Sequence, residues 1–276
     1  MDDTWDVDEL LEVARAVALE AGELVRSGRP DRVEVAATKS SAQDVVTEMD
    51  VAVERLLRER LALLRPGDGL LGEEGSSTAS ATGVTWVVDP IDGTVNYLYG
   101  LPSYSVSVAA VVGEPDPSAW TVLAACVHAP ADGRTYTATA GGGAYLEGRR
   151  LTVNQPASLL DSLVATGFGY RVDRRSGQAR VLTHVLPRVR DIRRLGSAAL
   201  DLCELAAGRV DLYYERGLSP WDLAAGLLVA TEAGARVSGL RGLPPGAAMT
   251  VAGPGELHAE LCTLLEAAGA DTDPAQ

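Results

Sequence analysis

The chain has 276 residues, of which 46% are hydrophobic and 22% are charged, and its formal net charge is −14. This composition is typical of a globular protein, and the length admits one domain or two. The acidic charge disfavours nucleic-acid partners, which need clustered positive charge, and no apolar run approaches the ~20 residues of a membrane helix.

Two further features favour a soluble, cytoplasmic protein. The N-terminal sequence is acidic and lacks the basic-then-apolar order of a secretion signal. The three cysteines, Cys126, Cys203 and Cys262, are far apart and flanked by apolar residues, so we interpret them as buried, reduced thiols.

The first half of the chain predicts two helices followed by an antiparallel sheet. Apolar residues recur at helical spacing over Val7–Arg26 and over about 44–64. Short β-rich runs follow, and the last of them forms a hairpin around residues 147–150. These predicted strands are 84–88, 104–112, 120–128, 135–139, and 144–146 paired with 151–153.

Beyond Pro156, predicted strands and helices alternate, which is typical of a layered α/β half. The predicted strands are 163–166, 192–195, 210–214 and 248–252, and the predicted helices are 176–186, 198–207, 221–233 and 256–267. We therefore divide the chain into residues 1–155, residues 156–270 and a frayed tail, 271–276.

The segment Asp89-Pro90-Ile91-Asp92-Gly93-Thr94 places two carboxylates where a predicted strand ends. Gly93 permits a close backbone approach, so the amides of Gly93 and Thr94 could face an anion such as phosphate. Aspartate oxygens suit Mg²⁺, and the lack of paired His or Cys argues against zinc. The structural alternative, in which Asp92 caps a helix and Asp89 closes a turn, stays open for this segment alone.

Two more acidic segments have the same ambiguity. Gly72-Glu73-Glu74-Gly75 sets adjacent carboxylates between glycines, and solvent alone explains most such pairs. In Ser219-Pro220-Trp221-Asp222, the serine is a plausible N-cap, the proline occupies the first helical position, and the aspartate could serve the cap. Each segment taken singly is more often structural than catalytic.

Together, and in this order, these segments resemble the inositol monophosphatase family of lithium-sensitive, magnesium-dependent phosphatases. The resemblance also includes Lys39 leading to Asp44-Val45-Val46-Thr47 and Asp50, Gly196-Ser197-Ala198-Ala199, and Tyr213-Tyr214-Glu215, and it spans roughly residues 8 to 266. Such ordered agreement is far more specific than any short motif. Val95 and Ser219 depart from common family residues, and we expect neither to touch a metal ligand.

The resemblance implies an α+β fold, the layered α-β-α-β-α sandwich of the inositol monophosphatase and fructose-1,6-bisphosphatase type. It implies two or three Mg²⁺ ions per site. By similarity, Glu73, Asp89 and the Ile91 carbonyl hold one ion, whereas Asp89, Asp92 and Asp222 hold a second. A third, weaker ion lies near Glu73.

By the same resemblance, a metal-activated water near Glu73, oriented by Thr94, attacks phosphorus, and Asp50 polarises Thr94. The implied substrate-binding residues are Asp92, Gly93, Thr94, Gly196, Ser197, Ala198, Glu215 and Asp222. Lys39, the only lysine in the chain, and Glu74 lie just behind the metal ligands.

The implied activity is hydrolysis of a small phosphorylated polyol, inositol monophosphate, by a homodimer acting in inositol metabolism. Histidinol phosphate, fructose bisphosphate and adenosine bisphosphate remain open as substrates, because relatives that act on them share the metal motifs. A regulatory protein acting with the transcription machinery and a catalytically inert magnesium-binding scaffold are rival hypotheses. For the arginine-rich stretch 171–194, a solvated helix face and contact with a second anionic group both remain open.

Overall fold

The computed structural model describes residues 5–30, 33–39 and 45–272. Residues 40–44 of the predicted lysine-to-aspartate motif and residues 273–276 of the predicted tail lie outside the described residues.

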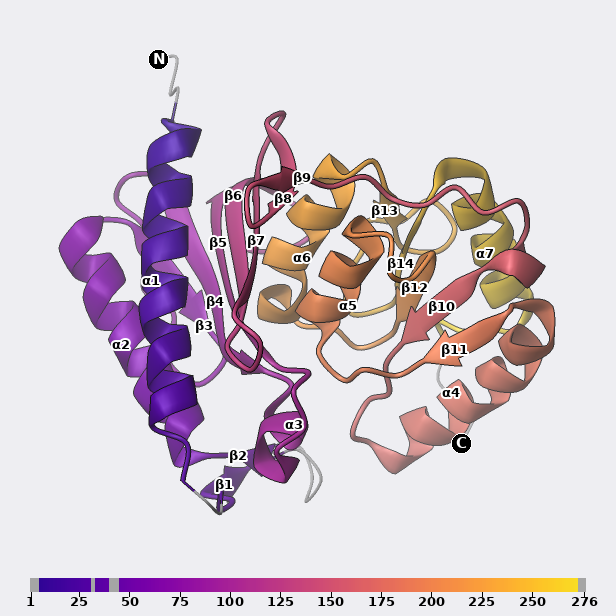
Figure 1. Ribbon diagram of the computed structural model, residues 1–276, viewed down its shortest axis with the longest axis horizontal. Coiled ribbons are helices and arrows are strands. Elements are labelled where there is room, and N and C mark those ends of the chain that lie inside the picture. The colour runs from indigo at the N-terminus through magenta and orange to yellow at the C-terminus, as the bar shows by residue number, and fades with distance from the viewer. Residues whose placement is uncertain (1–4, 31–32, 40–44, 273–276) are drawn as a thin grey trace.

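Helices and sheets stack in five alternating layers (Figure 1). The pair α1 and α2 covers one face of a seven-stranded sheet, α5 and α6 lie between this sheet and a five-stranded sheet, and α4 and α7 cover the far face. The predicted α-β-α-β-α fold is therefore confirmed. The helices are α1 (Val7–Ser27), α2 (Glu48–Leu64), α3 (Thr94–Tyr99), α4 (Val172–Val185), α5 (Ala198–Ala206), α6 (Pro220–Glu232) and α7 (Gly255–Ala267), with 3₁₀ turns η1 (Leu159–Asp161) and η2 (Leu186–Arg188).

The seven-stranded sheet has the order β3-β4-β5-β6-β7-β8-β9, and its pairs are antiparallel except for the parallel pair β3 and β4. Its strands are β3 (Gly69–Gly72), β4 (Val84–Asp92), β5 (Ser105–Gly113), β6 (Trp120–Ala129), β7 (Arg134–Thr139), β8 (Gly143–Leu146) and β9 (Arg149–Arg150).

The five-stranded sheet is mixed, in the order β11-β10-β12-β14-β13. Strand β10 is parallel to both of its neighbours, and β14 is antiparallel to both of its own. Its strands are β10 (Leu163–Thr166), β11 (Asp191–Arg193), β12 (Leu212–Glu215), β13 (Arg236–Ser238) and β14 (Thr250–Gly253). A small antiparallel pair, β1 (Ala37–Thr38) and β2 (Val45–Val46), carries Lys39 just beyond its first strand.

Buried apolar side chains fill the spaces between the layers. Leu10 and Leu57 pack against the outer face of the seven-stranded sheet, and Leu202 and Val229 fill the space between the two sheets. Leu261 packs beneath the five-stranded sheet. Burial at about 25 cal/mol per Å² makes these interlayer contacts the main stabilising contribution, and they fix the strand ends that carry the site.

Several predicted element boundaries are wrong. Helix α2 begins at Glu48 rather than near residue 44, because Thr47 and Asp50 form a capping box there. The hairpin's second arm is β9 rather than 151–153. Glu147 and Gly148 both have positive φ and close a two-residue turn, so pairing resumes at Arg149. The strands β1, β2, β3 and β13 were not predicted, and the division at residues 155 and 156 stays a prediction.

Candidate active site

Strand register brings the first acidic residues together. In the parallel pair, Gly72 is matched with Val88, so Glu73 emerges beside Asp89. Strand β4 continues through Asp92, with an irregularity in its pairing between Asp89 and Asp92. Pro90 is tolerated in this interval because it has no N–H to leave unpaired. The predicted end of the strand at residue 88 is therefore wrong, and the irregularity turns both aspartates toward one pocket.

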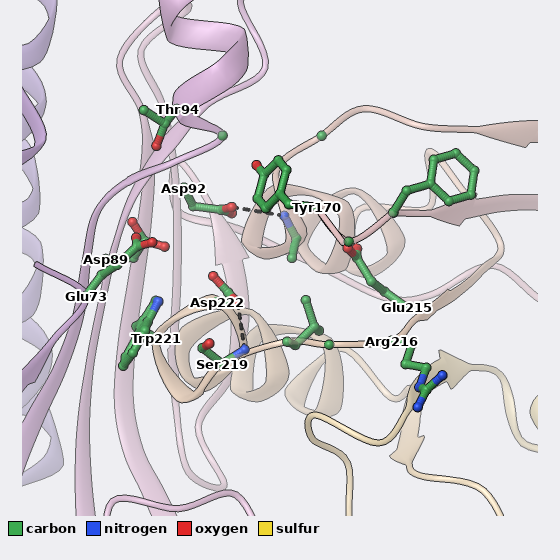
Figure 2. A pocket seen from close by; sticks show the side chains of 18 of the residues that line it. Glu73, Asp89, Asp92, Thr94, Tyr170, Glu215, Arg216, Ser219, Trp221 and Asp222 are labelled. Carbon is green, nitrogen blue, oxygen red and sulfur yellow. Dashed lines mark hydrogen bonds between the residues drawn. The ribbon is translucent and has the colours of Figure 1, made fainter. Parts of the chain in front are cut away.

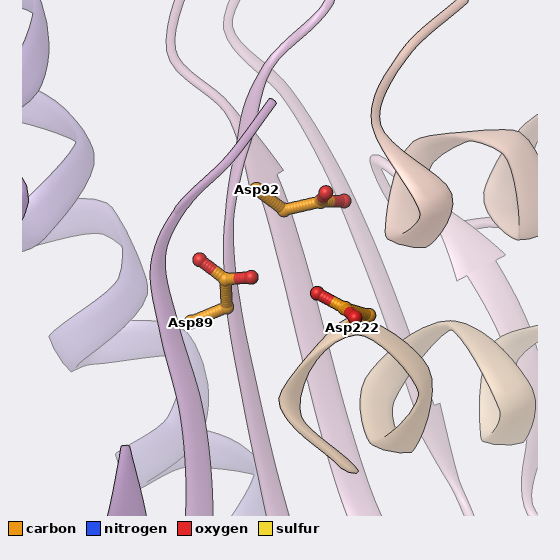
Figure 3. Close-up of side chains that lie close together, drawn as sticks. All are labelled: Asp89, Asp92 and Asp222. Carbon is orange, nitrogen blue, oxygen red and sulfur yellow. The ribbon is translucent and has the colours of Figure 1, made fainter. Parts of the chain in front are cut away.

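Helix α6 supplies the third aspartate. Ser219 and Asp222 form a capping box, in which the Ser219 N–H donates to Asp222 Oδ2 at 2.7 Å, and Pro220 occupies the first helical position. The predicted cap is confirmed. The expectation that Ser219 touches no predicted metal ligand is wrong, because the cap itself is a contact with Asp222. Carboxylate oxygens of Asp89, Asp92 and Asp222, one from each residue, lie within 4.8 Å of one another (Figure 3).

The electrostatics of this cluster favour a bound cation. Burial, followed by the neighbouring carboxylates, raises the pKa of Asp89 and of Asp222 well above the usual range, and burial raises the pKa of Asp92 to about 6. Three carboxylates this close cannot all ionise unless positive charge offsets them. Because all the donor atoms are oxygens, the residues fit a hard divalent cation rather than zinc.

The side chain of Asp92 also connects strand β4 to the start of helix α5. Ser197 Oγ and the Ala199 N–H donate to its Oδ2 at 2.6 and 2.7 Å, and the Ala198 N–H donates to its Oδ1 at 3.3 Å. The Asp92 carboxylate therefore accepts hydrogen bonds from the first turn of α5. These bonds fix the orientation of the carboxylate without neutralising it.

The side chains of Thr94 and Asp50 meet beside the aspartate cluster. The Thr94 hydroxyl lies 3.1 Å from Asp50 Oδ1 and 3.0 Å from the Ile91 carbonyl oxygen, and it can donate to either. The other carboxylate oxygen of Asp50 accepts from the Thr47 N–H at 2.8 Å and from the Thr47 hydroxyl. Asp50 thus uses Oδ2 to cap α2 and Oδ1 to orient Thr94. Burial raises its pKa, while these hydrogen bonds oppose the increase.

Lys39 links the two neighbouring glutamates. Its Nζ lies 2.6 Å from Glu73 Oε1 and 2.6 Å from Glu74 Oε1. The Glu74 amide in turn donates to the buried carboxylate of Glu54 at 2.6 Å. Burial raises the pKa of Glu73 to about 7, although the charge of Lys39 acts in the opposite direction. Lys39 therefore lies between Glu73 and Glu74, and the predicted position of Lys39 and Glu74 behind the metal ligands stays a prediction.

The acidic cluster forms one side of a cavity of about 380 Å³, within the ~300–1,000 Å³ usual for small-molecule sites. In Figure 2, Glu73 and Asp89 lie on one side of it, and Glu215 and Arg216 lie on the opposite side. Burial raises the pKa of Glu215 to about 7, and Glu215 accepts a hydrogen bond from the Tyr213 hydroxyl at 2.8 Å.

Most of the predicted site residues line this cavity, namely Lys39, Glu73, Asp89, Ile91, Asp92, Gly93, Thr94, Gly196, Ala198, Glu215 and Asp222. Ser197 lies behind the lining, 1% exposed, because its hydroxyl is engaged by Asp92. The predicted contact between Ser197 and substrate therefore stays a prediction that the observed hydrogen bond does not favour.

Several supporting residues were missed by the sequence analysis. Asn96 donates to the carbonyl oxygens of Ser103 and Leu195 at 2.6 and 2.7 Å, which ties α3 to the chain before Gly196. Its position three residues after Gly93, in the same motif, was the only available signal. Phe168 and Tyr170 also line the cavity, and no sequence pattern pointed to either.

Some arginines of the stretch 171–194 line the cavity, where they could contact an anionic group, and others lie on a solvated surface. Arg171, Arg174 and Arg194 line the cavity, together with Arg216 from β12's C-terminal side. Other arginines of the stretch are exposed, and Arg193 pairs with Asp191 at 2.6 Å. The histidines lie outside the cavity lining, and His128 and His258 are buried beside Thr135 and Ser238 hydroxyls. Cys126 and Cys203 are buried as predicted, whereas Cys262 is only partly buried.

Comparison with known proteins agrees with this geometry. Residues 6–270 match the inositol monophosphatase family. The chain is 48% identical to inositol-1-monophosphatase SuhB of Mycobacterium tuberculosis over 246 residues, 83% of each chain, and 36% identical to Nus factor SuhB of Pseudomonas aeruginosa over 239 residues, 84% of this chain and 86% of that one.

Among solved structures, that of the SuhB protein from Bartonella henselae superposes with a TM-score of 0.85 at 30% identity, covering 93% of this chain and 98% of that chain. Within the described part of the chain, every helix is too short or too polar to cross a membrane. The chain belongs to the inositol monophosphatase family of metal-dependent phosphoric monoester hydrolases.

Proposed function

We propose that this protein hydrolyses inositol monophosphate to inositol and phosphate with the help of Mg²⁺. The supporting observation is the cluster of Asp89, Asp92 and Asp222, whose oxygens converge within 4.8 Å at the wall of a cavity that also contains Thr94 and Glu215. Phosphate esters hydrolyse so slowly in water that catalysts must accelerate the reaction by up to ~10²¹-fold, and a converging carboxylate cluster is suited to that task.

Two ions would share Asp89. Glu73 and the Ile91 carbonyl would complete one ion's protein ligands, and Asp92 and Asp222 the other's, with a third ion held more weakly near Glu73. When bound, Mg²⁺ would activate water and offset the negative charge that develops on phosphate oxygens. The Ile91 carbonyl oxygen, which is 3.0 Å from the Thr94 hydroxyl, keeps a second lone pair for a ligand.

The chain's own residues would position the reactants. Because the Thr94 hydroxyl donates its proton to Asp50 or to the Ile91 carbonyl, its oxygen is free to accept a hydrogen bond from the attacking water. The phosphate would lie against Gly93 and Thr94, and Glu215 would accept a hydrogen bond from a hydroxyl group of the polyol. Water attacks phosphorus directly in this scheme, and no phosphoenzyme forms.

Substrate profiling tests the proposal. Phosphate release would be measured with inositol 1-phosphate, histidinol phosphate, fructose 1,6-bisphosphate and adenosine 3′,5′-bisphosphate across a magnesium titration. We expect magnesium-dependent hydrolysis, with inositol 1-phosphate as a good substrate. A tenfold preference for histidinol phosphate would overturn the assigned substrate, and the absence of hydrolysis at any magnesium concentration would overturn the activity.

The matched variants are Asp89→Asn and Asp116→Asn. An asparagine at position 89 keeps an acceptor for the Ile91 N–H, which now donates to Asp89 Oδ1 at 3.0 Å, and removes only the charge. Asp116 is exposed in a surface turn and pairs with Ser118. We expect the first variant to lose hydrolysis and the second to retain it.

A second candidate function is regulatory. The Pseudomonas aeruginosa relative is named a Nus factor, so a role with the transcription machinery is a specific alternative for this chain. Affinity capture of RNA polymerase components by wild-type protein and by Asp89→Asn would separate the two functions. Capture by the variant that has lost hydrolysis would support a separate regulatory role. If neither protein captures polymerase components, the regulatory hypothesis is rejected and the enzymatic function remains.

The proposal includes a cytoplasmic homodimer that lithium inhibits. Sedimentation equilibrium tests the dimer, since a monomer at micromolar concentration would contradict it. Inhibition by lithium in the magnesium assay tests the cation site.

A further inference from the structure

Arg174 occupies the side of the cavity away from the aspartate cluster. A methyl group placed on Gly217 would lie 2.5 Å from Arg174 Nη1, and one on Gly169 would lie 3.0 Å from its Cδ. The guanidinium is therefore stacked against Gly217, the residue after Arg216. Gly217 directly follows Glu215 and Arg216, which Figure 2 shows opposite Glu73 and Asp89, so the contact with Gly217 assigns Arg174 to that part of the cavity lining.

No acidic partner within the described residues accounts for Arg174 in this position. Its Nε is buried and has no hydrogen-bond partner there, and no carboxylate of those residues forms an ion pair with it. Arg171, by contrast, is paired with Asp173. Because the Arg174 side chain lines the cavity while Nε itself is buried, its terminal nitrogens are the donors that a ligand would meet.

Arg194 adds a second positive charge to the same cavity. Its Nη1 lies directly against Gly196, close to the space a side chain there would fill, and it lines the cavity with Arg174. Burial raises the pKa of Glu215 and of Asp92, and the Arg194 charge opposes this rise, although neither carboxylate forms an ion pair with it. Arg194 is exposed, so its guanidinium remains accessible to a ligand.

We propose that Arg174 and Arg194 form a subsite for a second acidic group, so that the cavity takes small phosphomonoesters carrying another phosphate or a carboxylate. This inference rests on the proposed phosphatase function. The aspartate cluster, with its cations, would bind the phosphate that is removed, and the arginines would bind the group that stays. Guanidinium groups match the planar, paired oxygens of both carboxylate and phosphate. Inositol monophosphate would leave this subsite to solvent.

A matched series of six-carbon esters tests the subsite. Glucitol 6-phosphate has no second acid, 6-phosphogluconate adds a carboxylate, and glucitol 1,6-bisphosphate adds a phosphate. We expect kcat/KM to be at least ~10-fold higher for one or both of the doubly acidic esters, because hydrogen bonds to charged groups are the strong ones. The stronger of the two identifies the source of the second acid. Equal values for all three esters would overturn the proposal.

Variants then assign the preference to residues. Arg174→Gln should reduce the preference for the doubly acidic esters by ~10- to 100-fold, Arg174→Lys should retain part of it, and Arg194→Gln should reduce it less. Arg180→Gln is the charge-matched control, because Arg180 is exposed on the same helix and does not line this cavity. A loss that is equal for all three esters would indicate a structural role and contradict the subsite.

The two proposals can fail separately. If wild-type protein hydrolyses none of the three esters with Mg²⁺, the phosphatase proposal fails. The subsite is then judged by calorimetric titration of glucitol 1,6-bisphosphate. Weaker binding to Arg174→Gln than to Arg180→Gln supports it, and equal binding overturns it.

Discussion

Asp92 shows how one carboxylate can serve both the fold and the site. Its Oδ2 accepts the two short hydrogen bonds from Ser197 and Ala199, and its Oδ1 accepts only the longer one from Ala198. An amide oxygen in the Oδ2 position would preserve both short bonds. One substitution can therefore remove the negative charge and keep the short α5 contacts, and another can remove both.

We predict that Asp92→Asn abolishes hydrolysis and changes the free energy of unfolding by less than about 1 kcal/mol, whereas Asp92→Ala also lowers it by about 2 kcal/mol or more, because buried donors lose their acceptor. Urea unfolding without metal, together with phosphate release, measures both effects. If Asp92→Ala were as stable as Asp92→Asn, the capping role would be refuted.

Glu215 predicts a pH dependence of stability. Its pKa is raised from 4.5 to about 7, mainly by burial, so the folded protein binds this proton more tightly than the unfolded chain does. Stability from this group is fully present below pH 4.5 and is lost as pH rises through 7. The slope contributed by one such group is at most about 1.4 kcal/mol per pH unit.

We therefore expect Glu215→Gln to flatten the fall in metal-free unfolding free energy between pH 5 and pH 7. Urea titrations at several pH values measure it. Glu256→Gln, at an exposed position on α7, is the control and should follow the wild-type curve. Parallel curves for wild type and Glu215→Gln would show that this carboxyl ionises normally.

At the scale of elements, the turn from β4 into α3 depends on Gly93. Its φ is +98°, a left-handed value that residues with a Cβ rarely adopt, and a methyl group there would lie 2.9 Å from the Ser103 carbonyl oxygen. Gly133 is a useful comparison, because its φ is +78° but nothing lies within 4 Å of an added methyl group. The pair separates backbone strain from steric contact.

We predict that Gly133→Ala lowers the free energy of unfolding by about 1 kcal/mol and that Gly93→Ala lowers it by at least about 1 kcal/mol more, with a loss of hydrolysis. Thermal unfolding and phosphate release provide the readouts. Equal destabilisation by the two substitutions would mean that the turn can move away from Ser103.

Helices and strands could be predicted where the residues that determine them are close together in the sequence. The α6 cap could be inferred from Ser219, Pro220 and Asp222, because capping needs only four consecutive residues. Strand β3 could not be inferred, because four residues that begin and end with glycine are too few to show a β-strand alternation. Its parallel pairing with β4 also depends on residues that are distant in the sequence. The position of Glu73 beside Asp89 follows from that pairing, so only the family resemblance suggested it.

At the scale of the whole molecule, the acidic ligands were easier to predict than the rest of the cavity. Asp89, Asp92 and Asp222 belong to recognisable motifs, and the fold brings them together as expected. Arg174 and Arg194 belong to a stretch with several exposed arginines, and only tertiary structure places them, together with Arg171, in the lining of the cavity. Their role could not be inferred from spacing, because neither helix α4 nor the segment that follows strand β11 has a pattern that fixes its orientation toward β4.

The same cluster couples metal binding to the stability of the molecule, because Asp89 and Asp92 come from β4 and Asp222 comes from α6. Burial and the neighbouring carboxylates raise the pKa of Asp89, so at pH 8 its ionised form opposes folding when no cation is bound. A cation that binds only the folded state adds RT ln(1 + [L]/Kd), about 2.7 kcal/mol at a hundred times Kd. Charge at position 89 should therefore destabilise the metal-free protein and stabilise the metal-loaded one.

We predict an inversion in thermal unfolding at pH 8. In EDTA, Asp89→Asn should have the higher Tm, because it keeps the acceptor for the Ile91 N–H and removes one buried charge. With saturating Mg²⁺ the wild type should gain several degrees and exceed the variant, which should gain little. Asp116→Asn, distant from the cluster, should shift with Mg²⁺ as the wild type does. A variant that gained as much as the wild type would show that Asp89 is not a ligand, whereas a variant less stable in EDTA would show that the carboxylate stabilises the fold without a cation.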